Sequence, residues 1–319
     1  MKKLLGIILV FILALSLTGC GGTDKNSIPK EGKTKEEKTI TIGVMPDIDS
    51  IPFIIAEKNG YFDQAGVNVK IEHFSSAKDR DSALQSGKLD GVINDVAAVV
   101  FANEGGIDLK MLAKTDITIS LLAGKDSGIH TVGDLKGKTV GLSTNTIMEY
   151  TLDRMLEDAN VQVGEIKKIA VPPIQTRLEM LQGGKLNAAI MPDPLAALAV
   201  KNGALILNST DKFGYKAGSI AFTSKSIKES PEEIKAVFTA YNKAVDYLRT
   251  EPAESYTDFV VQAQSFPVAV KDTLTLTQYT HATAPDPEIV ADVVKWMKSK
   301  ELIKKDYTYQ SLTVENFLR

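Results

Sequence analysis

Cysteine is nearly absent from the chain, and histidine is scarce. Cys20 is the only cysteine, so no internal disulfide can form. The three histidines, His73, His130 and His281, stand far apart, and none has the spacing of a zinc-binding helix. Neither a Gly-x-Ser-x-Gly elbow nor a Gly-x-Gly-x-x-Gly fingerprint occurs. We therefore expect no catalytic residue, no metal site and no cofactor.

The chain also has no strongly basic region. Without residues 1–19, which hold two lysines, 37 − 2 = 35 basic residues face 40 acidic ones, a net charge near 35 − 40 = −5. Basic and acidic residues are interleaved, whereas a nucleic-acid surface needs a basic stripe. A composition of 44% hydrophobic and 24% charged residues is typical of an ordinary globular protein. We expect no nucleic-acid partner.

The N-terminus has the layout of a secretory signal peptide. Lys2 and Lys3 give it a positive start, Leu4 to Leu17 carry no charge, and small residues precede Cys20. The sequence Leu17-Thr18-Gly19-Cys20 resembles the lipobox of bacterial lipoproteins, in which the cysteine sulfur receives a diacylglycerol and cleavage falls just before it. We predict a signal peptide over 1–19, lipidation of Cys20, and anchoring to the extracytoplasmic face of the cell membrane.

A polar segment follows the cysteine. Residues 20–38 contain many lysines, glutamates, glycines, serines and threonines and almost no large apolar residue. Such a composition cannot bury enough apolar surface to fold, so we predict a flexible tether. The remaining residues, 39–319, are numerous enough for two lobes.

The order strand, helix, strand, helix, strand occurs twice after the tether. Thr39–Val44, Val67–Phe74 and Gly91–Asn94 are the predicted strands of the first copy. The segment from Leu84 to Ile93 is echoed by Leu181 to Ile190, an offset of 181 − 84 = 97 positions. Two copies of one α/β unit explain this match, and each copy brings its own mostly parallel sheet flanked by helices.

Two segments with little helical character flank the second copy. They are Thr118–Ala123 and Gly218–Thr223, and we predict that they are the two strands that cross between the lobes. The predicted first lobe then comprises 39–120 plus 222–319, and the second lobe comprises 121–221.

Two helices with clear starts are predicted near the C-terminus. One begins at Ser230-Pro231 and the other at Asp286-Pro287, where a capping side chain precedes a first-turn proline. The second should bury its valines and Met297. We expect these helices to cover the first lobe, to which the chain returns.

Several short motifs, in this order, resemble those of one protein family. They are Ile51–Ala56, Asn59–Phe62, Ala65–Val67, Ser86–Gly91 and Asp134–Lys138. Here the chain is similar to the substrate-binding proteins of ABC importers for nitrate, sulfonates, taurine and thiamine precursors, the NMT1/THI5-like and SsuA-like group. The resemblance covers nearly the whole chain after the cysteine. It implies a two-lobed, type II periplasmic-binding-protein fold that closes on one small molecule and delivers it to a permease.

In open parallel sheets, ligands bind beyond the carboxyl ends of the strands, where helix N-termini present unpaired N–H groups. In both predicted sheets these ends lead into short polar loops and helix starts. The residues that we expect to bind the ligand are Asp47, Asp49, Ser50, Phe53, Ser75, Ser76, Asn94 and Asp95 in the first lobe, and Thr144, Asn145, Tyr150, Arg177 and Asp193 in the second.

Charge separates two ligand classes for these loops. A sulfonate or nitrate site needs helix N-termini, hydroxyl groups and an arginine, with carboxylates kept away. If two or more of the aspartates face the cleft, a ligand with N–H donors or positive charge is favoured; alternatively, each aspartate caps a helix or turn. Arg80 and Arg177 either pair with these carboxylates or meet an anionic group. For Phe53 core packing is the favoured role, whereas Tyr150 is a candidate for stacking on a ligand ring.

We therefore predict an extracytoplasmic solute-binding lipoprotein of an ABC importer, a monomer that works with a permease and its ATPase. It captures a small organic molecule by lobe closure, and a nitrogen heterocycle or thiamine-precursor-like compound is favoured. Three alternatives stay open: a binder of sulfonate, nitrate or taurine-type anions, a ligand sensor for a membrane kinase, and an enzyme related to pyrimidine synthases. The last depends on a cysteine-rich segment that this chain lacks.

Overall fold

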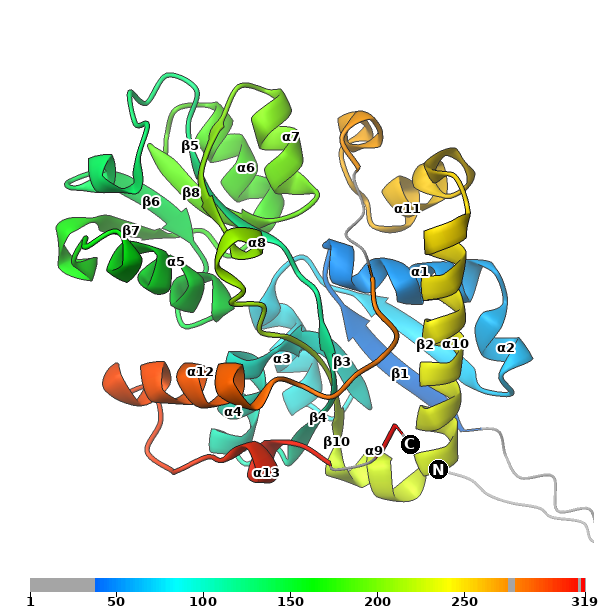
Figure 1. The fold of residues 1–319 in the computed structure, drawn as a ribbon. Coiled ribbons are helices and arrows are strands. Elements are labelled where there is room, and N and C mark those ends of the chain that lie inside the picture. The colour runs from blue at the N-terminus through cyan, green and yellow to red at the C-terminus, as the bar shows by residue number, and fades with distance from the viewer. Residues whose placement is uncertain (1–37, 275–278, 315–316, 319) are drawn as a thin grey trace, which may run out of the picture. The chain divides into compact units, whose positions relative to one another are not determined.

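A computed structural model describes residues 38–274, 279–314 and 317–318 (Figure 1). The predicted signal peptide, Cys20 and nearly all of the predicted tether lie outside the described residues. Within the described part, no helix is both long enough and apolar enough to cross a membrane.

The first sheet has five strands in the order β2-β1-β3-β10-β4. β1 pairs in parallel with β2 and β3, and β10 is antiparallel to both β3 and β4. Ile40, Ile42 and Val44 of β1 lie on one face of the sheet and are all fully buried, which places this face in the core. The strands are β1 (Thr39–Val44), β2 (Asn68–His73), β3 (Gly91–Asp95), β4 (Leu109–Thr115) and β10 (Gly218–Thr223).

The second sheet repeats this order as β7-β6-β8-β5-β9. β6 pairs in parallel with β7 and β8, and β5 is antiparallel to β8 and β9. Each sheet therefore has a single antiparallel strand in the same place, which confirms the predicted pair of mostly parallel sheets. The strands are β5 (Ile119–Ala123), β6 (Thr139–Leu142), β7 (Lys167–Ala170), β8 (Ala188–Pro192) and β9 (Leu205–Ser209).

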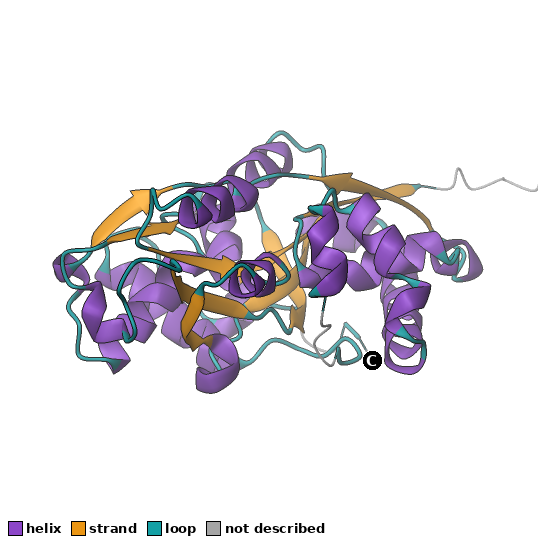
Figure 2. Cartoon of the chain, turned by 90° about the horizontal axis from the view of Figure 1, so that it is seen from above, coloured by secondary structure: helices purple, strands orange, loops and turns teal. Residues whose placement is uncertain are grey.

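Helices connect the strands and pack around both sheets, which form two separate groups of strands in Figure 2. The α-helices are α1 (Ile51–Lys58), α2 (Tyr61–Gln64), α3 (Ala77–Gln85), α4 (Val96–Glu104), α5 (Ile147–Asp158), α6 (Ile174–Gln182), α7 (Leu195–Lys201), α8 (Thr210–Phe213), α9 (Ser224–Glu229), α10 (Pro231–Thr250), α11 (Thr257–Ala263), α12 (Pro287–Ser299) and α13 (Tyr309–Leu312). The 3-10 helices are η1 (Ile48–Ser50), η2 (Val132–Leu135), η3 (Val163–Glu165), η4 (Ala253–Ser255) and η5 (Val268–Asp272).

The chain passes between the sheets twice, through residues 116–118 and, after α8, through 214–217. The two strands expected to cross between the lobes instead belong to one sheet each: β5 pairs wholly within the second sheet and β10 within the first. The limits predicted after residue 120 and before residue 222 fall inside these strands. The sheets divide the chain a few residues earlier at both places, because each crossing link is short and its strand pairs at once.

The C-terminal helices α10 and α12 pack against helices of the first lobe. α10 packs on α1 and α2, and α12 packs on α4 (Figure 1). Asp286 caps α12 by accepting the Glu288 N–H at 2.9 Å, and Val290, Val293 and Met297 form its buried face. The start of α10 differs in detail, because the Ser230 side chain makes no capping hydrogen bond.

Candidate ligand-binding cleft

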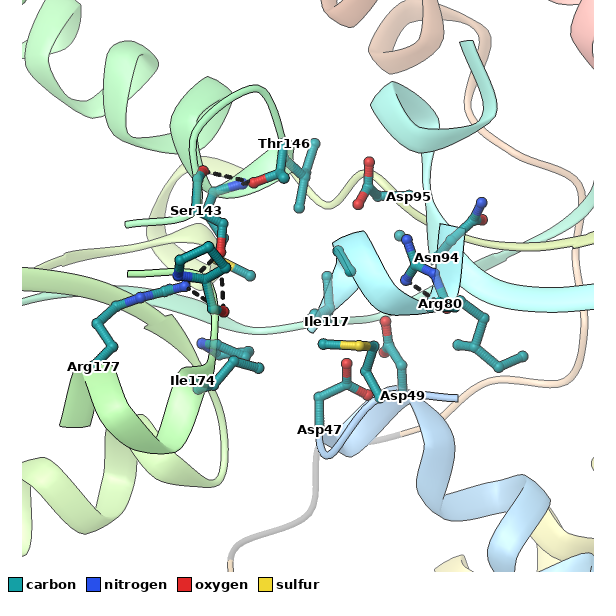
Figure 3. A pocket seen from close by; sticks show the side chains of 18 residues that line it. Asp47, Asp49, Arg80, Asn94, Asp95, Ile117, Ser143, Thr146, Ile174 and Arg177 are labelled. Atoms are coloured by element: carbon teal, nitrogen blue, oxygen red, sulfur yellow. Dashed lines mark hydrogen bonds between the residues drawn. The ribbon is translucent and has the colours of Figure 1, made fainter. Parts of the chain in front are cut away.

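A cavity of about 50 Å³ lies between the two sheets, where the carboxyl ends of their parallel strands face each other (Figure 3). Its walls come from the loops and helix starts that follow β1, β2, β6 and β7, from the ends of β3 and β8, from the crossing link at Ile117 and from Gly218 at the start of β10. This is the location that the strand-end rule predicts. The polar residues in the lining are Asp47, Asp49, Arg80, Asn94, Asp95, Ser143, Thr146 and Arg177.

Asp47 lies in the loop after β1 and caps η1. Its Oδ1 accepts the Ser50 N–H at 3.3 Å, and the Ser50 hydroxyl lies 3.2 Å away. Burial raises the pKa of Asp47 to about 6, against the lowering effect of these hydrogen bonds. The carboxyl group therefore changes charge in mildly acidic solution.

Asp49 is a buried carboxyl group with one paired and, within the described part of the chain, one unpaired oxygen. Thr115 Oγ1 donates to its Oδ2 at 2.5 Å, and its Oδ1 has no hydrogen-bond partner among the described residues. Burial raises the pKa of Asp49 well above its usual value, and the charge of Asp47 adds to the rise. Gly218, which also lines the cavity, lies against this pair. A Cβ there would collide with Thr115 Oγ1, so the position requires glycine.

Asn94 and Asp95 end β3 at the next corner of the cavity. Asp95 caps α4 by accepting the Ala98 N–H at 2.9 Å. Burial raises the pKa of Asp95 to about 6, although the charge of Arg80 opposes the rise. Asn94 Oδ1 accepts the Ser219 hydroxyl at 2.7 Å, whereas no described residue accepts from its Nδ2. This corner therefore combines a carboxyl group with an unpaired amide donor.

Arg80 and Arg177, which are 177 − 80 = 97 positions apart, occupy equivalent places in the two lobes. Arg80 Nη1 donates to the carbonyl of Ile93 at 3.0 Å, and Arg177 Nη1 donates to the carbonyl of Ile190 at 2.6 Å. The two acceptors are again 190 − 93 = 97 positions apart. The duplication thus extends to side chains that lie beside the cavity.

Neither arginine pairs with an aspartate of the cavity, contrary to one of the two roles expected for them. Arg80 Nε donates to Asp81 Oδ1 at 2.9 Å. Arg177 gives its other hydrogen bonds to the carbonyls of Val171 and Pro172 and to Ser143 Oγ. Burial lowers the pKa of Arg177 to about 10. Its main contacts are those of a structural cross-link in the cavity wall.

Asp193 differs from the other predicted aspartates. Its carboxylate accepts the Ala197 N–H at 3.1 Å in the first turn of α7 and lies outside the cavity lining. Its main-chain carbonyl accepts the Ile48 N–H at 3.2 Å, which joins the two lobes. Burial raises the pKa of Asp193 to about 6. The Asp193 side chain therefore acts as a helix cap, which is the alternative role considered for each aspartate.

Tyr150 does not face the cavity, so the prediction that it stacks on a ligand ring is wrong for this arrangement. It is fully buried, and its hydroxyl donates to Asp292 Oδ2 at 2.6 Å. Its ring packs edge-on against Trp296, 5.6 Å between centroids. The first turn of α5, at Ile147 and Met148, faces the cavity instead. Tyr150, farther along α5, points toward α12.

The other predicted residues also lie outside the cavity lining. Phe53 packs in the core, where its ring centroid lies 5.2 Å from the ring centroid of Tyr241. Core packing is the role that was favoured for it. Ser76 caps α3, and Ser50 is fully buried in η1. Thr144 and Asn145 are exposed residues of the loop before α5. Ser75 lines a neighbouring pocket.

Several lining residues were not singled out from the sequence. They are mostly apolar, and apolar residues after a strand look like core residues in a sequence. Ile117 had a usable signal, because it lies in the link between the lobes. The residues concerned are Met45, Ile93, Ile117, Ser143, Ile147, Met148 and Ile174.

Known proteins resemble this chain in sequence and in fold. The family model described as NMT1/THI5 like matches residues 47–255. A Bacillus subtilis protein provisionally named as an aliphatic sulfonates-binding protein is 27% identical over 272 residues, which cover 81% of this chain and 78% of that protein.

Two solved structures share the fold. The periplasmic aliphatic sulphonate binding protein SsuA from Escherichia coli has a TM-score of 0.74 at 18% identity, covering 87% of this chain and 92% of that chain. The alkanesulfonate-binding protein SsuA from Xanthomonas axonopodis pv. citri, bound to MOPS, has a TM-score of 0.73 at 19% identity, with coverages of 84% and 94%. These likenesses confirm the two-lobed periplasmic-binding-protein fold. Because the family model matches well over half of the chain, the protein belongs to the NMT1/THI5-like family.

Proposed function

We propose that this protein is the solute-binding component of an ABC importer, and that it captures a small organic molecule bearing N–H donors or a positive charge. A nitrogen heterocycle fits this description. One observation carries the ligand class: Asp47, Asp49 and Asp95 all line one cavity, and Asp49 Oδ1 is left without a partner among the described residues. Such a ligand is favoured when two or more of the aspartates face the cleft.

The charges around the cavity support this ligand class. The guanidinium groups of Arg80 and Arg177 already donate to main-chain carbonyls. An anion would enter beside three carboxyl groups whose pKa values burial has raised. A cation or strong N–H donor instead stabilises their ionised form, so each carboxylate gains a partner.

The size of the cavity supports capture by lobe closure. A volume of about 50 Å³ holds only a few water molecules, so an organic ligand requires the lobes to separate as it enters. The hydrogen bond from Ile48 N–H to the Asp193 carbonyl joins the lobes at this point and would break on opening. Closure over a bound ligand then gives the permease one conformation to recognise.

A second candidate ligand is an aliphatic sulfonate. It is favoured by the name of the Bacillus subtilis relative and by the names of the SsuA structures. Physically, a sulfonate would need the cavity carboxyls to be protonated, so that each could donate a hydrogen bond instead of repelling the anion. The raised pKa values make that state accessible in mildly acidic solution.

We also propose that Cys20 carries the lipid that holds the protein on the extracytoplasmic face of the cell membrane. Two or more acyl chains on one residue suffice for stable anchoring. A flexible tether would keep the binding lobes close to the permease and its ATPase and raise their effective concentration. The working unit is a monomer. Adjacent permease and ATPase genes would support import, whereas an adjacent sensor kinase gene would support the signalling alternative.

The ligand class is tested by isothermal titration of the full-length protein in mild detergent with 4-aminopyrimidine and with ethanesulfonate. We expect the aminopyrimidine to bind more tightly, and Asp49→Asn to weaken it at least about tenfold, the effect of losing one charge-assisted hydrogen bond. Asp246→Asn is the matched control, because Asp246 is an exposed carboxylate paired with His281. Tighter binding of ethanesulfonate that survives Asp49→Asn would contradict the proposed class in favour of the second candidate.

The absence of catalysis is tested separately. We expect the bound compound to be recovered chemically unchanged after long incubation, since the protein would work by binding and closure alone. Mass spectrometry of the released compound measures this, and steady conversion to a product would support the enzyme alternative instead.

A further inference from the structure

A second pocket of about 210 Å³ lies next to the cavity that contains Asp49. Pro46 and Pro173 line it, whereas their chain neighbours on either side line the first cavity. One loop from each lobe therefore separates the two spaces. The remaining wall comes from the end of β2, the starts of α6 and α7 and the end of α11, and the last of these lies outside both duplicated units.

Gln264 is the unusual residue of this second pocket. Its side chain is only 4% exposed, yet neither Nε2 nor Oε1 has a hydrogen-bond partner among the described residues. Buried amide groups are almost always paired, because an unpaired donor or acceptor loses its bonds to water without replacement. An amide with both ends free, in a residue that lines a pocket, has the chemistry of a ligand-binding group.

The main chain around Gln264 is firmly held. The Gln264 N–H donates to the Val260 carbonyl at 3.0 Å, and the Phe266 N–H donates to the Val261 carbonyl at 3.0 Å. Ser265, between them, has a φ of 54° and turns the chain at the end of α11. The backbone of Gln264 is thus held by a well-bonded turn, so a ligand that pairs with its amide requires no further ordering of the main chain.

The rest of the lining suits a flat ring. Phe74 and Phe266 supply aromatic surface, and Leu195 with the two prolines supplies aliphatic surface. Besides Gln264, the polar residues of the wall are His73, Ser75, Gln175 and Ser265. A ring between apolar walls, with one polar edge directed at an amide, is the usual design of a small-molecule pocket.

We propose that this pocket is a second binding site, and that it takes a planar cyclic amide whose adjacent N–H and C=O groups pair with the Gln264 side chain. Gln264 Oε1 accepts the N–H of the ligand, and Gln264 Nε2 donates to its carbonyl, so both unpaired atoms are satisfied at once. Recognition depends on this paired edge and on the aromatic walls. It does not depend on the charge of the Asp49 cavity, and the two sites can therefore be tested independently.

The probe is 2-pyridone, with N-methyl-2-pyridone as the matched compound that lacks the N–H. Binding to the full-length protein is followed by nuclear magnetic resonance titration in the millimolar range. We expect 2-pyridone to bind and the methylated compound to bind at least about tenfold more weakly, because a missing partner leaves the buried amide unpaired. Failure of 2-pyridone to bind, or equal binding of the two compounds, would overturn the proposal.

Gln264→Leu tests the residue itself, with Gln262→Leu on the exposed side of α11 as the control. Gln264→Leu should weaken 2-pyridone binding at least about tenfold without lowering the urea midpoint of unfolding, because it replaces an unpaired buried amide with an apolar group. Gln264→Glu, which keeps the shape and loses the Nε2 donor, should weaken binding in the same way. Unchanged affinity in these two variants would be fatal to the proposal. Asp49→Asn should leave 2-pyridone binding unchanged. A failure of the ligand class proposed for the Asp49 cavity can therefore be distinguished from a failure of the proposed site at Gln264.

Discussion

Gly218→Ala should displace the hydrogen-bonded pair that holds Asp49 in the cavity wall. A Cβ at this position would collide with Thr115 Oγ1 and approach Asp49 Oδ2 to 2.9 Å. Overpacking of this kind costs about 1–3 kcal/mol, and loss of the hydrogen bond between Thr115 and Asp49 adds about 0.5–1.5 kcal/mol. We expect the free energy of unfolding to fall by about 2–4 kcal/mol, measured by urea denaturation with circular dichroism.

The steric argument is tested by a double-mutant cycle with Thr115→Ala. That change alone should cost about 1–2 kcal/mol, because Asp49 Oδ2 loses its donor. In its background the nearest atom to the new methyl group is gone, although Asp49 Oδ2 stays 2.9 Å away, so Gly218→Ala should cost about 1 kcal/mol less than it does in the parent protein. Gly164→Ala is the control, since a Cβ there meets nothing within 4 Å. Costs that simply add, with no coupling between the two changes, would refute the reasoning.

Three further predictions concern other parts of the protein. Tyr150→Phe should lower the free energy of unfolding by about 1–2 kcal/mol through loss of the bond to Asp292, and leave ligand affinity unchanged; a large loss of affinity would return Tyr150 to the site. Burial would raise the pKa of Glu149, but hydrogen bonds from two lysines outweigh it and lower the pKa to about 2. Its stabilising contribution is therefore present above its ordinary pKa of 4.5 and is lost as pH falls toward 2. In urea titrations, Lys300→Met should make the free energy of unfolding depend less on pH in this range. An unchanged pH dependence would count against the role of the lysines that contact Glu149. Cys20→Ser should be missing from the membrane fraction or remain unprocessed, and normal lipid labelling of that variant would contradict the anchor.

The duplicated fold could be predicted from the sequence because its signals are local. Each of these signals spans only a few consecutive residues. They are the apolar run of β1 and the repeated segments that begin at Leu84 and Leu181. The division between the lobes was less accurate. β5 and β10 have the same apolar character as the strands around them, and only their pairing shows the sheet to which each belongs.

The candidate cavity was predicted where chain position alone fixes a side chain. Asp47 and Asp49 lie in the segment after β1 and Asp95 ends β3, and the ends of parallel strands meet at one edge of a sheet. Tyr150 was misplaced because its position depends on the rotational phase of α5 and on Asp292, which is 142 positions away. The side chain of Asp193 was misplaced because it accepts the Ala197 N–H outside the lining, whereas Asp95 accepts the Ala98 N–H and still faces the cavity, and chain position does not separate the two cases.

The apolar lining and the second pocket were beyond sequence reasoning. Ile93 and Ile174 cannot be told from core residues by type or spacing. Gln264 comes from α11, far from both duplicated units, and nothing in its neighbourhood marks an unpaired amide. Only the tertiary structure brings α11 against the loops after β1 and β7.

The pH dependence of ligand affinity tests the central claim most directly. Asp47 and Asp95 have pKa values raised to about 6, so both gain charge between about pH 5 and pH 7. A ligand with positive charge binds the ionised form, and its affinity should rise at least about tenfold over this range, with proton release in titrations in buffers of different ionisation enthalpy. An affinity that falls as pH rises, with proton uptake, would show an anion in the cavity and contradict the account.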